Sequence, residues 1–130
     1  MNSGTYVLVI KLESSVPIER PKAMVLEEGI YVYVGSAKRG LLSRLRRHLS
    51  KGKKIHWHID QLTEKATPVF FAALLGRKLE QELSDFLEER FQVIEGFGSS
   101  DLSSKGNLFR VSSLSSFLAE FKEFCEKEGV

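Results

Sequence analysis

Three things are scarce in this sequence: cysteine, long apolar runs and acidic residues near its centre. The single cysteine, Cys125, excludes an internal disulfide, and no histidine lies near it in the chain to complete a metal site. No apolar run approaches the ~20 residues that cross a bilayer, and no signal-like segment opens the chain. We therefore expect a cytoplasmic protein that does not contact a membrane.

Acidic residues are absent from residues 29–59, although this window holds 8 of the 19 Lys and Arg residues. All 17 Asp and Glu residues lie outside it, so the rest of the chain is net negative while the whole chain carries +2. A local cationic patch of this kind indicates a polyanionic ligand such as nucleic acid. A solvated basic helix is the alternative, and composition does not separate the two.

The length and composition of the chain fit one compact domain. Of the 130 residues, 42% are hydrophobic and 28% charged, which is within the ordinary globular range. There is no internal repeat and no linker long enough to divide the chain. We therefore predict a single domain over residues 1–130.

Strand-forming segments occupy the first part of the chain. Residues 6–10 form a continuous β-rich apolar run, which predicts a central strand covered on both faces. Residues 13–28 are polar and broken by prolines, which indicates a hairpin or loop. Residues 30–34 predict a second strand, and we expect it to stop at Gly35 and Ser36.

A cationic helix follows the Gly-Ser turn. Leucines recur with helical period, and a stripe of polar cations adjoins them: Leu41, Leu42, Leu45 and Leu49 beside Arg44, Arg47, His48 and Lys51. We expect the leucine face to pack against the core. The neighbouring face would then present its cations to an anion.

The remaining segments alternate between helix and strand. Residues 55–62 are ambiguous between a strand and a loop that passes into a helical turn. The other predictions are a strand at 67–75, a helix at 77–91, a Gly/Ser-rich loop at 92–107, a short strand at 108–111, and a last helix from 114 capped by Ser112 or Ser113. Together they predict an α/β (α+β) fold with a small central mixed or antiparallel sheet flanked by helices.

Short motifs in this chain resemble those of the GIY-YIG nuclease family. They are the Gly-Thr-Tyr of residues 4–6, the Tyr-Val-Gly of residues 33–35, Arg44, His48 and Glu80. The literal Gly-Ile-Tyr at 29–31 is not the first motif, because Tyr31 and Tyr33 share one face of one strand, whereas the two family motifs need neighbouring strands. The first motif departs from the family at Thr5, and the connection to the second is longer than usual.

The resemblance is closest to a small free-standing branch of the family whose function is uncharacterised. Three of its motifs stand here, at residues 31–37, 56–60 and 96–101, so the likeness covers nearly the whole chain. In that branch cysteines tend to follow the third motif. Here Leu102, Ser103 and Ser104 replace them, which removes any role of those cysteines in metal binding or cross-linking.

The resemblance implies an endonuclease that hydrolyses DNA with one divalent metal ion, Mg²⁺ or Mn²⁺, bound by Glu80. Among the acids of its predicted helix, Glu80 also lies nearest the apolar stripe, so its carboxylate would face the sheet. By the same likeness Arg44 would neutralise charge on the phosphoryl oxygens. Tyr6, Tyr33 or His48 would activate water, with Tyr6 as the base and His48 as a proton relay.

Further residues are candidates for contact with DNA: Lys38, Arg39, Arg47, Lys51, Lys53, Lys54, Trp57 and Asn107. Trp57 would stack on a base or anchor the core, and Asn107 matches a family asparagine that orients the site. His56 and His58 have no third ligand nearby, so we expect a structural or substrate-contact role for them.

The expected substrate is DNA, branched or damaged forms included. Because the chain has no recognisable second domain, either a protein partner supplies specificity or the substrate is recognised by its shape. Two alternatives from other classes stay open. One is a non-catalytic nucleic-acid-binding module, and the other is a protein-interaction domain whose basic window is neutralised by an acidic partner.

Overall fold

The computed structural model describes residues 2–19, 23–55, 58–97 and 106–130. Its elements in chain order are β1 (Gly4–Leu12), β2 (Val16–Ile18), β3 (Met24–Leu26), β4 (Gly29–Ala37), α1 (Leu41–Leu49), α2 (His58–Thr63), β5 (Thr67–Leu75), α3 (Glu80–Glu88), β6 (Gln92–Ile94), β7 (Leu108–Val111) and α4 (Leu114–Glu128). This is a small α+β fold, as the sequence predicted.

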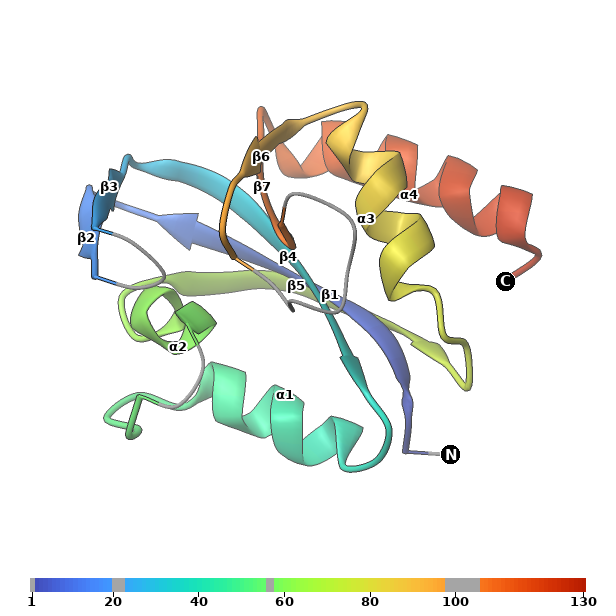
Figure 1. Ribbon diagram of the computed structural model, residues 1–130, viewed down its shortest axis with the longest axis horizontal. Coiled ribbons are helices and arrows are strands. Elements are labelled where there is room, and N and C mark those ends of the chain that lie inside the picture. Colours follow the sequence, from blue (N-terminus) through green and yellow to red (C-terminus); the bar gives the residue numbers. More distant parts are fainter. Residues whose placement is uncertain (1, 20–22, 56–57, 98–105) are drawn as a thin grey trace.

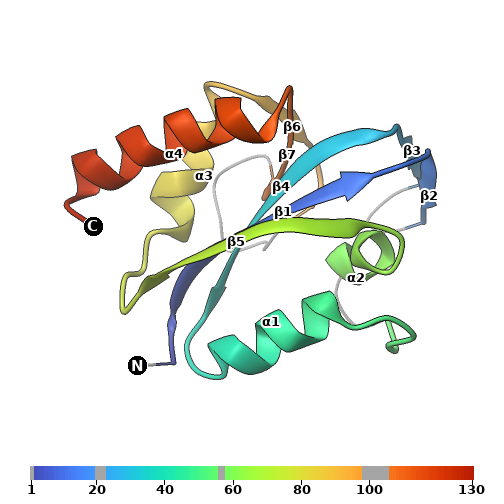
Figure 2. The same cartoon turned by 180° about the vertical axis from the view of Figure 1, so that it is seen from behind.

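Five strands form one sheet in the order β5-β1-β4-β7-β6, and each neighbouring pair is antiparallel. The sheet lies between two helical layers, with α1 and α2 on one side and α3 and α4 on the other (Figures 1 and 2). The separate β2–β3 hairpin takes up the long connection between β1 and β4. Among the described residues, no helix combines the length and apolar composition needed to span a membrane.

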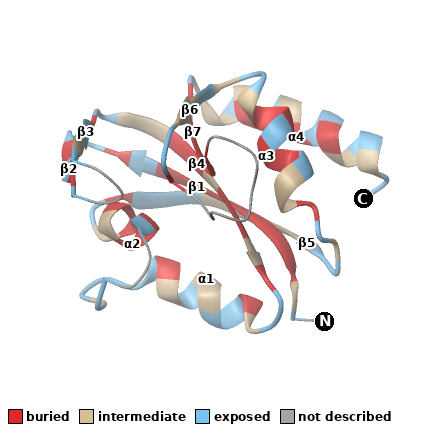
Figure 3. Cartoon of the chain, viewed as in Figure 1, coloured by how far each residue is buried: buried red, intermediate tan, exposed pale blue. Residues whose placement is uncertain are grey.

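Strand β1 is central, as predicted, because both of its faces are apolar. Val7 and Val9 pack toward α3 and α4, whereas Tyr6 and Leu8 belong to the clusters on the other face. Buried residues accordingly follow the middle of the sheet and the inner sides of the helices (Figure 3). The β1–β4 register pairs Tyr6 with Gly35 and Leu8 with Tyr33, so the two motif strands are neighbours.

Strand β4 is longer than the sequence indicated. It was expected to stop at Gly35 and Ser36, but it continues to Ala37 because β1 pairs with it as far as Gly4↔Ala37. The turn comes later, and Gly40 supplies it with a left-handed backbone (φ 71°). A Gly-Ser pair suits a turn in isolation, and here the antiparallel ladder keeps it extended.

Helix α1 is present as predicted, but it ends at Leu49, before Lys51 of the expected cationic stripe, and its orientation differs. Leu42 and Leu49 are 67% and 46% exposed, so the expectation that the whole leucine face packs was wrong. His48 is buried instead, beside Leu41. A buried polar side chain needs a hydrogen-bond partner, and His48 finds one in Tyr6 on the sheet.

The later elements mostly follow the prediction. Strand β5 and strand β7 have the expected bounds, and α4 begins with Ser113 as its cap, whose side chain accepts from the amide of Ser116. The ambiguous segment is helix α2 from His58 onward, and α3 is shorter than predicted at each end.

The segment 92–107, predicted to be largely loop, begins with a short strand that the sequence interpretation did not identify. Residues Gln92–Ile94 form β6 and pair with β7. Three residues bounded by turn signals carry little strand pattern of their own, so the pairing is a tertiary effect.

Candidate functional site

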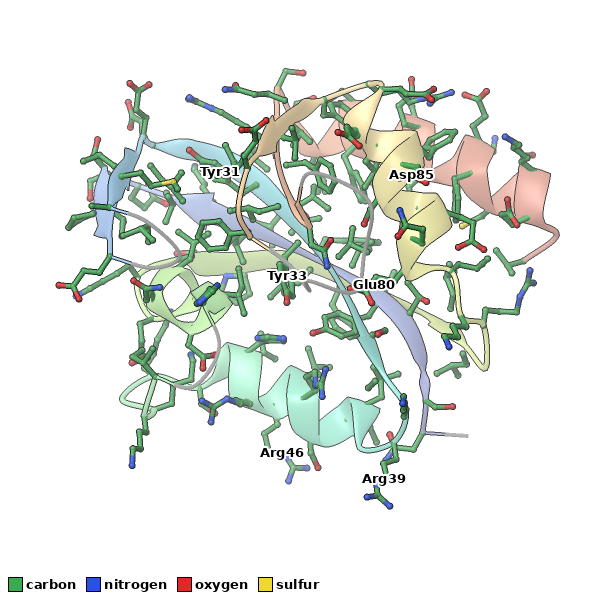
Figure 4. All side chains as sticks on the ribbon, viewed as in Figure 1. Tyr31, Tyr33, Arg39, Arg46, Glu80 and Asp85 are labelled. Carbon is green, nitrogen blue, oxygen red and sulfur yellow. The ribbon has the colours of Figure 1, made fainter. Side chains whose placement is uncertain are left out.

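The site forms where β4 extends beyond its neighbour β7. The β4–β7 pairing ends at Tyr33↔Leu108, and the amide of Val34 then donates to the carbonyl of Asn107 (2.9 Å). The last residues of β4 therefore have helix α1 on one side and the start of α3 on the other. Figure 4 shows Tyr33 and Glu80 at this end of β4.

Three aromatic rings meet on the α1 side of the sheet. Tyr6 and Tyr33 have ring centroids 6.3 Å apart, and His48 lies 5.7 Å from the first and 5.9 Å from the second. Tyr6 Oη and His48 Nε2 are 2.8 Å apart in a buried hydrogen bond. Gly35 makes room for this arrangement, because a Cβ there would collide with the Tyr6 ring.

Burial shifts the pKa values of this hydrogen-bonded pair in opposite directions. It raises the pKa of Tyr6 well above 10 and lowers the pKa of His48 to about 4, where Lys53, Arg44 and Arg47 reinforce the shift and Asp60 opposes it. Both side chains are therefore neutral near pH 7. With its proton on Nδ1, His48 can accept the Tyr6 hydroxyl proton at Nε2.

The second tyrosine is affected by the same surroundings. Burial raises the pKa of Tyr33 to about 12; Glu80 adds to the rise, whereas Arg44 opposes it. Tyr33 also contributes to the raised pKa of Tyr6, which a hydrogen bond from Arg44 partly offsets. Glu80 acts on both hydroxyls, so the acid and the tyrosines share one electrostatic environment although they come from different elements.

Ser36 connects the arginine to the glutamate. Arg44 Nη1 donates to the Ser36 carbonyl oxygen (2.5 Å), and the Ser36 hydroxyl donates to Glu80 Oε1 (2.8 Å). The other carboxylate oxygen, Oε2, accepts from Asn107 Nδ2 at 2.6 Å. Glu80 is thus oriented by two neutral donors, and its carboxylate faces the end of the sheet as the helical pattern predicted.

Glu80 is suited to a hard divalent cation. Each carboxylate oxygen accepts one hydrogen bond and retains acceptor capacity, and the residue is only half-buried. In the described part of the chain, no three His, Cys, Asp or Glu side chains gather to hold a metal ion. Mg²⁺ fits such a site because it takes one or two carboxylates and completes its shell with water and phosphate.

Three hydroxyl residues of this region were not predicted. Besides Ser36, Thr5 accepts from the amide of Leu79 and donates to the carbonyl of Arg77, and Ser84 donates to Asn107 Oδ1 (3.4 Å). Thr5 lies on the same face of β1 as Val7 and Val9, and Ser36 lies on the same face of β4 as Val32 and Val34. A hydroxyl on an apolar stripe was the sequence signal that could have identified them.

The predicted DNA-contact residues fall into two groups. Lys38, Arg39 and Lys54 are exposed, and Figure 4 shows Arg39 extending away from the protein at the start of α1, with Arg46 farther along the helix. Trp57 and His56 lie outside the described residues, as do positions 98–101 of the third motif. The exposed cations remain available for a polyanion.

The second group is used inside the protein. Arg47 pairs with the fully buried Asp60 (Nη2 to Oδ2, 2.7 Å), and Lys51 Nζ donates to the carbonyls of Thr63 and Ala66 (2.5 and 2.6 Å). Lys53 lies 3.6 Å from Glu64 with its side chain only 5% exposed. Arg47 ties α1 to α2, and Lys51 and Lys53 tie the loop before α2 to the end of α2 and the segment after it. Asn107 is likewise only 2% exposed and serves Glu80, which fits an orienting role rather than a DNA contact.

No curated protein matches this chain, and no solved structure matches it. One family model covers almost the full length, over residues 5–130. The chain therefore belongs to the family described as "Domain of unknown function DUF123".

Proposed function

We propose that this chain is a divalent-metal-dependent endonuclease domain of the GIY-YIG type, which hydrolyses phosphodiester bonds in DNA in the cytoplasm. The supporting observation is the convergence at one end of the sheet of Tyr6, Tyr33, Arg44, His48 and Glu80, from β1, β4, α1 and α3. These are the residues that the resemblance to that family names. Their joint position is a property of the tertiary structure, independent of that resemblance.

Arg44 would stabilise the charge that develops on the phosphate. Its guanidinium is half-buried and anchored to the Ser36 carbonyl, so it is held in place before substrate arrives. A preorganised donor in a partly dry site stabilises a phosphoryl transition state more than a mobile surface lysine does.

Tyr6 and His48 would activate the water together. The raised pKa of Tyr6 keeps it protonated, so by itself it is a poor base. As the water gives its proton to Tyr6 Oη, Tyr6 can pass its own proton to His48 Nε2, 2.8 Å away. The water is left as the hydroxide that attacks phosphorus, the bond to the leaving oxygen breaks, and His48 holds the proton as imidazolium.

Glu80 would hold the metal ion, with Ser36 and Asn107 fixing its carboxylate. A bound Mg²⁺ or Mn²⁺ supplies Lewis-acid stabilisation of the phosphoryl and leaving oxygens. The exposed Lys38, Arg39 and Lys54 would contact the DNA backbone without reading sequence. Branched or damaged DNA recognised by shape, or a protein partner, would then supply the specificity.

The decisive test is cleavage of linear, flap and branched DNA in Mg²⁺ or Mn²⁺. We expect Glu80→Gln to lower the rate by about 10²–10³-fold, because it removes the charge while keeping the size of the side chain. Glu82→Gln is the matched control, an exposed acid in the same first turn of α3, and its rate should equal that of wild type. DNA binding in EDTA should be similar for all three proteins.

The competing function is a nucleic-acid-binding module without catalysis. The observation in its favour is the burial of Tyr6. Its side chain is only 2% exposed, so a water molecule can reach the hydroxyl only if neighbouring side chains move. If wild type binds DNA with a steep salt dependence but cuts no faster than Glu80→Gln, this alternative replaces the nuclease.

A further inference from the structure

A groove next to the proposed catalytic cluster has no role so far. Its volume is about 360 Å³, within the ~300–1,000 Å³ range of small-molecule sites. Three separate segments line it: the start of β1, the end of β4 and the loop between β5 and α3. Three of its lining residues are cations, Lys38, Arg77 and Lys78, and none of the eight is acidic.

The loop carrying two of these cations is held tightly. The amide of Gly76 donates to the carbonyl of Ser3 (2.9 Å), and the Thr5 hydroxyl contacts both the carbonyl of Arg77 (2.9 Å) and the amide of Leu79 (2.8 Å). Gly76 has a left-handed backbone (φ 72°), and a Cβ on Gly4 would collide with the Leu74 carbonyl. The backbone from which Arg77 and Lys78 extend is therefore held in place along the groove.

Ser36 joins this groove to the catalytic cluster. It lines the groove, while its hydroxyl donates to Glu80 and its carbonyl accepts from Arg44. One residue thus separates a cationic groove from the acid and the arginine proposed to act on a phosphate. Successive phosphates along a nucleic-acid strand are also close neighbours, so one phosphate at the catalytic cluster would place the next one near the groove.

We propose that this groove binds the phosphate group adjacent to the one being cleaved. The inference rests on the proposed nuclease function and adds a substrate requirement to it, namely a strand with at least two consecutive phosphates. Lys38 and Lys78 are exposed and supply the charge, and Arg77, tied to the Glu128 carbonyl (3.1 Å), supplies a positioned guanidinium. Serine hydroxyls and glycine backbone on the remaining walls permit close approach of phosphate oxygens.

The test compares two thymidine dinucleotides by NMR of the ¹⁵N-labelled chain in EDTA, where binding is measured without cleavage. One probe is TpT, and the other is pTpT, which has a second phosphate. For wild type we expect pTpT to bind about tenfold tighter, a difference of ~1.4 kcal/mol. We also expect its additional chemical-shift changes at the amides of Gly4, Lys38, Gly76 and Lys78.

The double variant Lys38→Ala/Lys78→Ala should bind both probes equally. Its matched control is Lys122→Ala/Lys127→Ala, which removes the same charge from exposed positions of α4 and should keep the preference for pTpT. On longer DNA, the salt slope of the groove variant should fall by about 0.7 for each single-strand phosphate that it no longer neutralises. All four lysines are exposed, so the fold should be retained, and circular dichroism checks this.

Failure of this proposal differs visibly from failure of the nuclease. An unchanged pTpT preference in the groove variant, an equal loss in the α4 control, or equal competition by a glutamate peptide of the same charge would each overturn the groove assignment, even if DNA is cleaved. Loss of the preference in the groove variant alone supports a second phosphate site in the groove, even if cleavage is not detected and the catalytic proposal falls.

Discussion

The two faces of the sheet bury different chemistry. Toward α3 and α4 lies one apolar cluster that consists mainly of valines, leucines and phenylalanines, and the buried polar residues on that side, Thr5, Ser84 and Asn107, are uncharged. Toward α1 and α2 the protein buries ionisable groups: His48 at 3% exposure and Asp60 at 0%, beside Tyr6. Both faces are covered by helices, so burial alone does not distinguish them.

The difference separates a face that buries mainly apolar surface from a face that also buries ionisable groups. Apolar burial contributes roughly 25 cal/mol per Å², whereas an ionisable group removed from water costs free energy unless it is neutral or well paired. The protein accepts that cost around His48 and Asp60 and offsets it with the Tyr6 and Arg47 hydrogen bonds. A face selected for stability alone has no need of these groups.

The largest effect is expected from the apolar face. Phe117 is fully buried against that cluster, so Phe117→Ala should lower the free energy of unfolding by about 3–5 kcal/mol, because it removes apolar contacts and leaves a cavity. Urea denaturation measures the change. Leu42→Ala is the control, since Leu42 is 67% exposed and should cost less than about 0.5 kcal/mol. Equal losses would show that the two sites do not differ in burial as described.

The next prediction concerns the pH dependence of stability that His48 causes on the α1 side of the sheet. The pKa of His48 is about 4 in the fold against 6.5 ordinarily, because burial disfavours its charged form. Between these two values the unfolded chain binds a proton at residue 48 that the folded chain does not. Stability should therefore fall as pH drops from 6.5 to 4, by roughly 3 kcal/mol in total, and this group should contribute no pH dependence above 6.5.

His48→Gln isolates this contribution, because glutamine does not titrate and can still hydrogen-bond. Denaturation curves at several pH values between 4 and 7 should converge for wild type and variant as the pH falls. Acidic side chains elsewhere titrate in both proteins and cancel in the difference. Curves that remain parallel over this range would contradict the assignment of His48 as a buried neutral base.

The smallest effect concerns the packing of the site. Gly35→Ala places a Cβ against the Tyr6 ring and should cost about 1–3 kcal/mol through overpacking. By displacing Tyr6 it should also slow DNA cleavage by about 10²-fold. If the strain acts through that ring, adding Tyr6→Leu should recover part of the stability, whereas additive losses in the double variant would place the strain elsewhere.

Much of the fold could be predicted because its elements have local signals. The apolar run of β1, the leucine period of α1 and the Ser113 cap of α4 each appear in the sequence and in the structure. Errors occurred where a tertiary partner overrode the local preference. Gly35 and Ser36 stay extended because β1 pairs with them, and β6 exists because β7 lies beside it.

The candidate site was predictable in part. The resemblance named Tyr6, Arg44, His48 and Glu80, but spacing along a chain says nothing about the distance between side chains 40 or more residues apart. Ser36 and Thr5 went unnoticed because their roles depend on partners in α1, α3 and the loop before α3. The basic window was interpreted as one surface, yet Arg47 and Lys51 are used within the protein.

By itself the sequence determined the fold class, most of the elements and the presence of a basic helix after a tyrosine strand, because periodicity and propensity act over a few residues. Only the tertiary structure decided which side of α1 faces the sheet, that His48 meets Tyr6, and that Ser36 links Arg44 to Glu80. The physical reason is that a buried polar group must find its hydrogen-bond partner in space, and that partner comes from another element.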